Sequence, residues 1–257
     1  MDKFPLIIGH RGASAVAPEN TMGAFRKAIE VGADGIEFDV RLSRDGVPIV
    51  IHDETLHRTG LRSDYVSCLS AEELQQVNVG KWFGHRRNSA DDYVNETVPT
   101  LRKLLDYSSS VDAVLYLELK CRREETTQIA SITCDLLVNY QLAERVIIEC
   151  FDLPVIQEVK RIAPHLKTAA LFQPRISRPH LWSSSKSIIE EARAVGADEI
   201  ALHHKLADDR TIESAHSTGL KVVIWTVDDP AWIIRAKKLG VHALITNDPA
   251  SMIRHDD

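Results

Sequence analysis

Closely spaced cysteine pairs are absent from this sequence. Its four cysteines, Cys68, Cys121, Cys134 and Cys150, are scattered along the chain, and no two of them form a C-x-x-C pair. Their spacing argues against both a zinc knuckle and a dithiol redox pair. Isolated thiols in a large domain are typical of a reducing compartment, so we expect a cytoplasmic location.

Long apolar runs and a secretory leader are also lacking. No apolar stretch approaches the roughly 18 residues that a membrane-spanning helix needs. Residues 1–5 lead directly into a strand-like segment, without the basic and apolar regions of a signal peptide. We therefore expect no stable insertion into a membrane.

Runs of lysine or arginine are missing as well. The net charge is −6, and an acidic chain without a basic run is not expected to bind nucleic acid. The partner that we expect is a small molecule. Nothing in the sequence indicates the oligomeric state.

What the sequence does contain is a repeated unit of helix, glycine, short loop and apolar strand, as at residues 31–38, 195–202 and 239–245. Glycine just past a helix end supplies a left-handed residue, and repeated units of this kind predict a parallel sheet with outer helices. The apolar segments predict nine strands, at residues 5–9, 35–40, 47–52, 113–119, 145–150, 167–172, 198–202, 220–227 and 242–246.

Nine strands are one more than an eight-stranded barrel requires. The connection at 41–46 is too short for a crossover helix, so it either forms a hairpin through Asp45 and Gly46 or runs extended across the barrel. An open doubly wound sheet is the alternative architecture. The length of 257 residues and the number of units favour a single-domain TIM-like (β/α)8 barrel over residues 1–257.

Residues 54–98 interrupt this rhythm. Within them only 70–77 has a helical pattern, with Ser70 as N-cap and Glu73 completing a capping box. We interpret 54–98 as a small insertion after the third strand, where it would shape a substrate pocket. A surface excursion without a role is the alternative.

Charged residues follow four of the apolar runs. In a parallel α/β protein such strand ends meet at one edge, where active sites form. The residues concerned are His10-Arg11, Glu37-Phe38-Asp39, His52-Asp53 and Glu118-Leu119-Lys120.

The acidic residues among them suit a metal ion. Glu37 and Asp39 share one face of a strand, because side chains alternate along it, and carboxylates that close need a proton or a cation. Together with Glu118 they would form an all-oxygen set for one hard divalent cation, Mg²⁺ or Ca²⁺. The alternative is a solvated acidic face, since apolar residues alternate with the two acids.

Two histidines and two cations complete the set. Near neutral pH, one of His10 and His52 can accept a proton while the other donates one, as phosphodiester cleavage requires. Arg11 offers a planar fork for phosphate oxygens, and Lys120 could neutralise charge on phosphorus. The alternatives are structural histidines and a salt bridge that holds Glu118.

Further motifs accompany these residues in a fixed order, at 18–21, 45–48, 80–83, 99–101 and 225–227. With them, the chain resembles the glycerophosphodiester phosphodiesterase family over nearly its whole length. The resemblance implies a TIM-like barrel with a small insertion after the third strand. It also implies hydrolysis of glycerophosphodiesters to glycerol 3-phosphate and an alcohol.

The resemblance further implies residue roles. In similar proteins, the residues matching Glu37, Asp39 and Glu118 bind the divalent metal. Those matching His10 and His52 act as general acid and base, and those matching Arg11 and Lys120 contact the phosphate. Glu19 matches a position near the metal, as a ligand either directly or through water.

Other positions are read locally. Asn20 or Thr21 can cap the helix that starts near residue 22. Phe151 and Trp225 follow strands and are predicted to line the substrate groove, with core packing as the alternative for Trp225. The chain departs from the family at Cys150, Asp228 and Asn247, where serine, asparagine and often aspartate are usual.

We therefore predict a metal-dependent phosphodiesterase with two-histidine acid/base catalysis. The alternatives are a phospholipase D-like phosphodiesterase acting on lysophospholipids and a non-catalytic phosphate-binding protein on the same fold. The sequence leaves open the alcohol head group, Mg²⁺ or Ca²⁺, water or the glycerol 2-hydroxyl as nucleophile, and which histidine is the acid.

Overall fold

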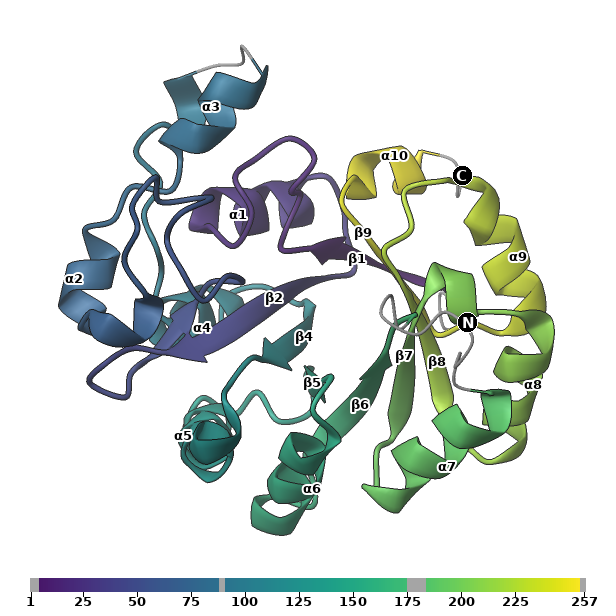
Figure 1. Cartoon of the computed structure of the whole chain (residues 1–257). Helices are drawn as coiled ribbons and strands as arrows, with labels where there is room; N and C mark the ends of the chain where they lie inside the picture. The colour runs from purple at the N-terminus through teal and green to yellow at the C-terminus, as the bar shows by residue number, and fades with distance from the viewer. Residues whose placement is uncertain (1–4, 88–90, 175–183, 255–257) are drawn as a thin grey trace.

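The computed structural model describes residues 5–87, 91–174 and 184–254. Within these ranges, eight parallel strands close into the predicted TIM-like barrel (Figure 1). The ring closes because β1 pairs in parallel with both β2 and β9. The strands are β1 (Leu6–His10), β2 (Gly35–Leu42), β4 (Val114–Leu119), β5 (Val146–Cys150), β6 (Lys167–Phe172), β7 (Glu199–His203), β8 (Lys221–Trp225) and β9 (Ala243–Thr246).

The ninth strand, β3 (Pro48–Val50), lies outside the ring. It runs antiparallel to β2, with Val40 opposite Val50. The turn between them uses Gly46 at φ +75°, a conformation that favours glycine. A parallel partner would need a crossover of a dozen or more residues, so this short connection forms the hairpin. The insertion therefore follows the third strand of the chain, but that strand is not a member of the barrel.

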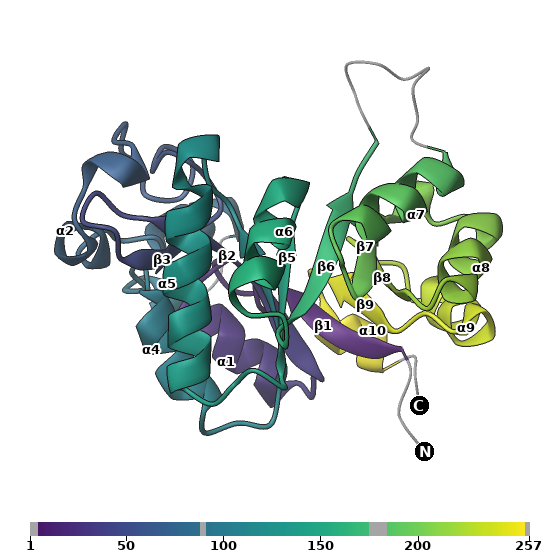
Figure 2. The ribbon, with the colours of Figure 1, turned by 90° about the horizontal axis from the view of Figure 1, so that it is seen from below.

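Helices surround the ring (Figure 2). Alternate strand residues face outward and pack against these helices, as Phe38 does against Phe25 at 5.9 Å between ring centroids. The other residues fill the barrel interior, among them Ile8, Tyr116 and Val223. The surrounding helices are α1 (Met22–Glu30), α4 (Leu101–Ser108), α5 (Thr126–Asn139), α6 (Leu153–Ile162), α7 (Ser185–Ala194), α8 (Asp209–Ser217), α9 (Ala231–Leu239) and α10 (Pro249–Ile253), with the 3₁₀ turns η3 (Arg123–Glu125) and η4 (His204–Leu206) between them.

The segment 54–98 packs around a small hydrophobic cluster of its own, which includes Leu56, Leu74 and Val98. The capping box of Ser70 and Glu73 is present and starts a helix. The prediction missed a second helix, which begins after Asn78, whose side chain accepts hydrogen bonds from two following backbone N–H groups. The segment contains η1 (Val66–Cys68), α2 (Ala71–Gln75), α3 (Lys81–Arg87) and η2 (Asp91–Tyr93).

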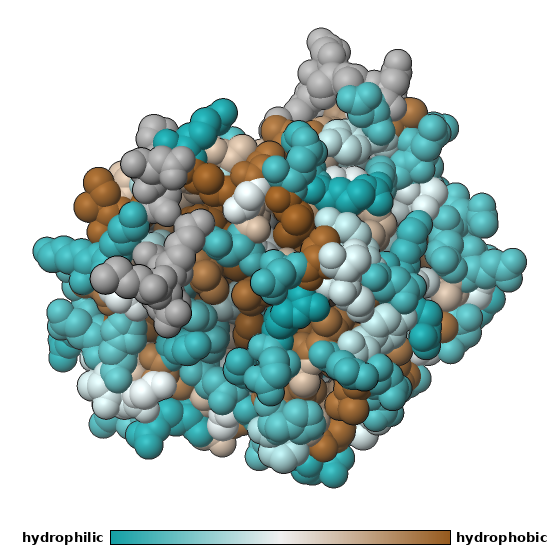
Figure 3. Space-filling view, turned by 180° about the vertical axis from the view of Figure 1, so that it is seen from behind, coloured by the Kyte–Doolittle hydropathy of each residue, from teal (hydrophilic) through white to brown (hydrophobic). Residues whose placement is uncertain are grey.

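The surface mixes polar and apolar side chains, as the view from behind shows (Figure 3). Among the described residues, the exposed large apolar side chains are few and come from four parts of the chain: Val16, Leu61 and Tyr65, Val138, and Ile234. Among the described residues, no helix combines the length and the apolar character needed to cross a membrane.

Candidate active site

Three acidic side chains meet inside the barrel, as the sequence predicted. Glu37 and Asp39 come from β2, and Glu118 lies beside Asp39 on β4 in direct register. Glu118 is two residues from the interior residue Tyr116 and so faces the same way. One oxygen from each acid lies within 4.8 Å of the other two, and all three residues are buried.

Burial gives these acids unequal proton affinities. Burial and the Asp39 charge raise the pKa of Glu37 well above its usual range and that of Glu118 to about 7. Burial acts in the same direction on Asp39, but Arg11 and Lys120 outweigh it and lower the pKa of Asp39. Near neutral pH the group therefore holds protons, which a divalent cation would displace. A buried set of three carboxylates fits a hard cation.

Both predicted phosphate-binding cations lie against these acids. The Arg11 backbone N–H donates to Glu37 at 2.9 Å, and its Nε lies 3.2 Å from an Asp39 oxygen. Lys120 donates to Glu118 at 2.6 Å and lies 3.2 Å from Asp39. The salt bridge considered for Lys120 from the sequence is thus present. Contact of either cation with phosphate stays a prediction.

From the sequence, either Asn20 or Thr21 could cap the helix that starts near residue 22. In the structure the two residues have different roles. Thr21 is the cap of α1, because its hydroxyl accepts a hydrogen bond from the Ala24 N–H at 3.2 Å. Asn20 adopts φ +56°, which asparagine tolerates better than most residues. Its amide donates to Asp39 at 2.7 Å and accepts from the Asp39 N–H at 3.2 Å. Asn20 therefore fixes the acid with the lowest pKa of the three.

His10 ends β1 and is held by a chain of hydrogen bonds. Its Nδ1 lies 2.7 Å from Oδ1 of Asn247, which also accepts from the Ser14 hydroxyl. The Asn247 amide nitrogen donates to Asp228 at 2.7 Å. Burial, reinforced by the Arg11 charge, lowers the pKa of His10 to about 4, so the imidazole is neutral near pH 7.

His52 follows β3 and has a carboxylate as its partner. Its Nδ1 lies 2.6 Å from Oδ1 of Asp53. Burial lowers the pKa of His52, whereas the charge of Asp39 and the hydrogen bond to Asp53 act in the opposite direction. The two predicted catalytic histidines thus differ in their partners, an amide for His10 and a carboxylate for His52.

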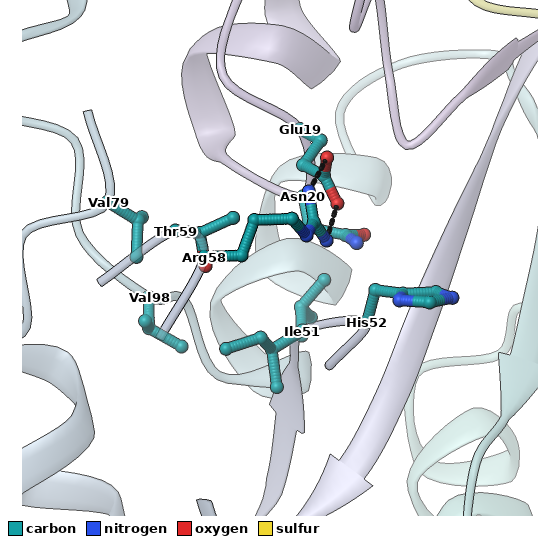
Figure 4. A pocket seen from close by; sticks show the side chains of 9 residues that line it. Glu19, Asn20, Ile51, His52, Arg58, Thr59, Val79 and Val98 are labelled. Carbon is teal, nitrogen blue, oxygen red and sulfur yellow. Dashed lines mark hydrogen bonds and ion pairs between the residues drawn. The ribbon is translucent and has the colours of Figure 1, made fainter. Parts of the chain in front are cut away.

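Glu19 does not join the three acids. Its Oε1 accepts from Arg11 at 2.7 Å. Arg58 donates to Oε1 at 2.8 Å and to Oε2 at 2.5 Å (Figure 4). Sequence reasoning missed Arg58, because its partner Glu19 lies 39 residues away and the spacing of 5 residues to Asp53 matches no pattern. Both oxygens of Glu19 therefore bond to arginine, and its contact with the metal, directly or through water, stays a prediction.

Of the two aromatic residues predicted to line the groove, Phe151 lies beside Lys120 and packs against Trp225, and their contact with substrate stays a prediction. Phe151 and Trp225 pack edge to face with ring centroids 5.5 Å apart, and the Lys120 ammonium lies 5.8 Å from the Phe151 ring. The Trp225 indole donates to the Ala201 carbonyl at 3.1 Å. Both rings contact the inner core while remaining partly exposed, so wall and core packing are compatible here.

The three departures from the family pattern have different surroundings. Cys150 packs in the outer core, and its thiol donates to the Leu119 carbonyl at 3.0 Å. Asp228 and Asn247 instead form the support of His10 described above. These two departures therefore reach a predicted catalytic residue, whereas Cys150 faces the helices.

A fourth buried acid was missed. Glu149 lies beside Glu118 in register on β5 and is 2% exposed. Among the described residues, nothing hydrogen bonds to its Oε2. Burial and the neighbouring carboxylates raise the pKa of Glu149 well above its usual range, which favours its neutral, protonated form. Sequence reasoning missed Glu149 because a single acid within an apolar strand does not change the pattern that predicts the strand.

Glu149→Gln is expected to stabilise the metal-free protein increasingly as pH rises. When the pKa of an acid is higher in the folded protein than in the unfolded chain, the free energy of unfolding falls as pH rises between the two pKa values. The fall is about 1.4 kcal/mol per pH unit. Glutamine removes this loss. The Tm difference between variant and wild type in EDTA should therefore grow from pH 4.5 to pH 8. A difference that stays constant over this range would contradict the assignment of a neutral Glu149.

Comparison with known proteins agrees with this fold and identifies the family. Residues 10–251 match the model of the glycerophosphoryl diester phosphodiesterase family. A glycerophosphodiester phosphodiesterase from Caldanaerobacter subterraneus subsp. tengcongensis is 34% identical over 250 residues, which cover 96% of each chain. Fold and relatives together define a barrel enzyme that hydrolyses phosphodiesters. The chain belongs to the glycerophosphoryl diester phosphodiesterase family, as the resemblance implied.

Solved structures share the architecture. A crystal structure from Silicibacter pomeroyi is 26% identical with a TM-score of 0.87, covering 99% of this chain and 94% of that one. An Oleispira antarctica phosphodiesterase shares the fold at 24% identity and a TM-score of 0.85, over 98% and 96% of the two chains. The latter structure is a complex of that protein with its product, sn-glycerol-3-phosphate.

Proposed function

We propose that this enzyme hydrolyses glycerophosphodiesters to sn-glycerol 3-phosphate and an alcohol with one divalent cation, Mg²⁺ or Ca²⁺. The observation that carries the proposal is the buried trio of Glu37, Asp39 and Glu118, whose oxygens lie within 4.8 Å of one another. The cation would polarise a phosphate oxygen as a Lewis acid. The product of the Oleispira neighbour is the one that we propose here.

His10 is assigned as the general base from the direction of its hydrogen bonds. The Asn247 amide nitrogen donates to Asp228, so Oδ1 of Asn247 is the acceptor for His10. Nδ1 of His10 therefore carries the proton, and Nε2 keeps its lone pair. This Nε2 lies 3.8 Å from Glu37, on the side of the acids. It is the atom that takes a proton from the attacking hydroxyl group.

His52 is assigned as the general acid. A carboxylate 2.6 Å from Nδ1 stabilises the positively charged imidazolium, which an amide partner does not. The protonated ring can then give the proton on Nε2 to the departing alkoxide. One neutral and one proton-donating imidazole are the pair that this reaction needs.

The remaining residues bind and orient the substrate. Arg11 and Lys120 would contact the phosphate oxygens, with their charges held in place by the acids. Phe151 and Trp225 would form an apolar wall for the glycerol carbons. Glu19 would act on the metal site indirectly, through Arg11.

Three further proposals concern the protein as a whole. The chain forms one domain over residues 1–257, with 54–98 as an insertion within it. Its partner is a small-molecule glycerophosphodiester rather than nucleic acid. Its location is cytoplasmic.

Chelation is expected to abolish turnover, and metal add-back to restore it. A screen over glycerophosphodiesters with different head groups, with a lysophospholipid as the comparison substrate, should be run in EDTA and after addition of Mg²⁺ or Ca²⁺. Release of glycerol 3-phosphate measures the reaction. Equal rates with and without EDTA would contradict the metal-dependent mechanism, and faster release from the lysophospholipid would contradict the substrate class.

A further inference from the structure

We propose that Arg58 is a positioning residue that sets His52 and Arg11 together from within the insertion. This inference rests on the proposed function, because it concerns how those two residues are held for the reaction. Arg58 follows β3, outside the barrel ring, yet its guanidinium bridges two acids, Asp53 and Glu19, that each support a different residue of the site. Figure 4 shows its contact with Glu19.

The first of these acids is Asp53. Arg58 donates from Nε to Oδ2 of Asp53 at 2.7 Å and from Nη2 to Oδ1 at 3.0 Å, a two-pronged contact that fixes the plane of the carboxylate. Oδ1 is the same oxygen that lies 2.6 Å from Nδ1 of His52. The orientation of the His52 ring is therefore determined through Asp53 by Arg58.

The second acid is Glu19. Arg58 donates from Nη1 to Oε2 of Glu19 at 2.5 Å and from Nη2 to Oε1 at 2.8 Å. Oε1 also accepts from Arg11, whose Nε lies 3.2 Å from Asp39. The same guanidinium thus reaches the acid trio through a second path. Loss of Arg58 would release both supports at once.

The surroundings of Arg58 indicate that its guanidinium holds other side chains in place and does not contact substrate. Its four hydrogen bonds leave the guanidinium little capacity for a phosphate. The cavity beside it measures about 10 Å³, space for about one water molecule. Its guanidinium also lies 5.8 Å from the ring of Trp82 on α3, so a helix of the insertion contacts Arg58 as well.

Charge balance gives Arg58 a second effect on His52. Burial raises the pKa of Asp53, but the bonds from Arg58 and His52 outweigh it and bring the pKa to about 2, so Asp53 is ionised. Arg58 offsets that negative charge. Without Arg58, Asp53 would draw a proton onto His52 more strongly, and His52 would give it up less readily to the leaving alkoxide.

The test compares Arg58→Gln and Arg58→Lys with Arg62→Gln. Arg62 is a matched control because it lies in the same segment and forms an exposed ion pair with Asp64 at 2.9 Å. For each variant, kcat and KM are measured from pH 5 to 9. The substrate is the glycerophosphodiester that the wild type hydrolyses fastest in the activity screen described above. Tm is measured in parallel, and all assays are run well below the lowest Tm.

Arg58→Gln is expected to lower kcat by roughly 10- to 100-fold, the size of effect that a small misplacement of a catalytic group produces. KM should change less, and the basic limb of the kcat profile should move to higher pH. Arg58→Lys should recover part of kcat, because a lysine keeps the charge but not the fork. Arg62→Gln should behave as wild type.

Wild-type kcat and an unchanged pH profile in Arg58→Gln would overturn the inference. So would a loss in Arg58→Gln that Arg62→Gln matches, because that would mark a general effect of the segment. If Arg58→Gln does not fold, a wild-type kcat and pH profile in Arg58→Lys would equally refute it. An inactive wild type would instead refute the proposed function, which separates the two failures.

Discussion

His10→Ala and His52→Ala are each expected to lower kcat by about 10²- to 10⁴-fold while the barrel stays folded. The reason is that each imidazole moves one proton of the proposed reaction, and neither contributes a large apolar surface to the core. Circular dichroism and Tm would verify the fold, and release of glycerol 3-phosphate would measure turnover.

His204→Ala is the matched control for both histidine variants. His204 also follows a barrel strand, but its Nδ1 bonds to the Thr226 carbonyl at 3.0 Å and it has no part in the proposed proton transfers. Its variant should retain kcat within about threefold of wild type, because no step of the proposed reaction uses the His204 side chain. Near-normal turnover in both His10→Ala and His52→Ala would refute the proposed mechanism.

The double variant Glu37→Gln with Glu118→Gln is expected to separate metal binding from stability. Both acids have raised pKa values, so they hold protons in the metal-free protein near neutral pH, and glutamine resembles the protonated form. The Tm in EDTA should therefore fall less than in a variant that loses the ionised Asp39, even though Glu118→Gln weakens the contact with Lys120. Turnover should fall by roughly 10³-fold or more, because loss of the cation removes several kcal/mol of charge stabilisation.

The decisive measurement is the shift in Tm on adding Mg²⁺ or Ca²⁺. A cation at 100 times its Kd stabilises the wild type by about 2.7 kcal/mol, and the double variant should show no such shift. Asp39→Asn provides the contrast, because Asp39 is ionised and paired with Arg11 and Lys120, so its loss should lower Tm even in EDTA. A metal-induced shift retained in the double variant would contradict the site.

The parts of the molecule that were predictable are those encoded by local periodicity. The barrel strands are apolar runs, and glycine at the end of a helix precedes β2, β7, β8 and β9, so their positions follow from the chain alone. Glu37 and Asp39 were placed correctly because two residues apart on a strand means the same face. The strand ends that carry His10 and Glu118 followed from the same reasoning, since parallel strands end at one edge.

The parts that were missed depend on contacts between distant segments. Arg58 bonds to Glu19 across 39 residues, and no spacing rule connects the two positions. Glu149 is hidden because a single acid in an apolar strand leaves the pattern intact. The choice of His10 as base required the direction of hydrogen bonds through Asn247, which only coordinates supply.

The hairpin gives the two proton-transfer groups unequal mechanical support. His10 ends β1, which is paired on both sides within the ring, with β2 and with β9. His52 follows β3, a short strand outside the ring. β3 pairs with β2 on one side and has only an isolated bridge, between Ile49 and Thr100, among the described residues on the other. Substitutions at that edge can therefore shift His52, the proposed general acid, while the ring that carries His10 and the three carboxylates is left undisturbed.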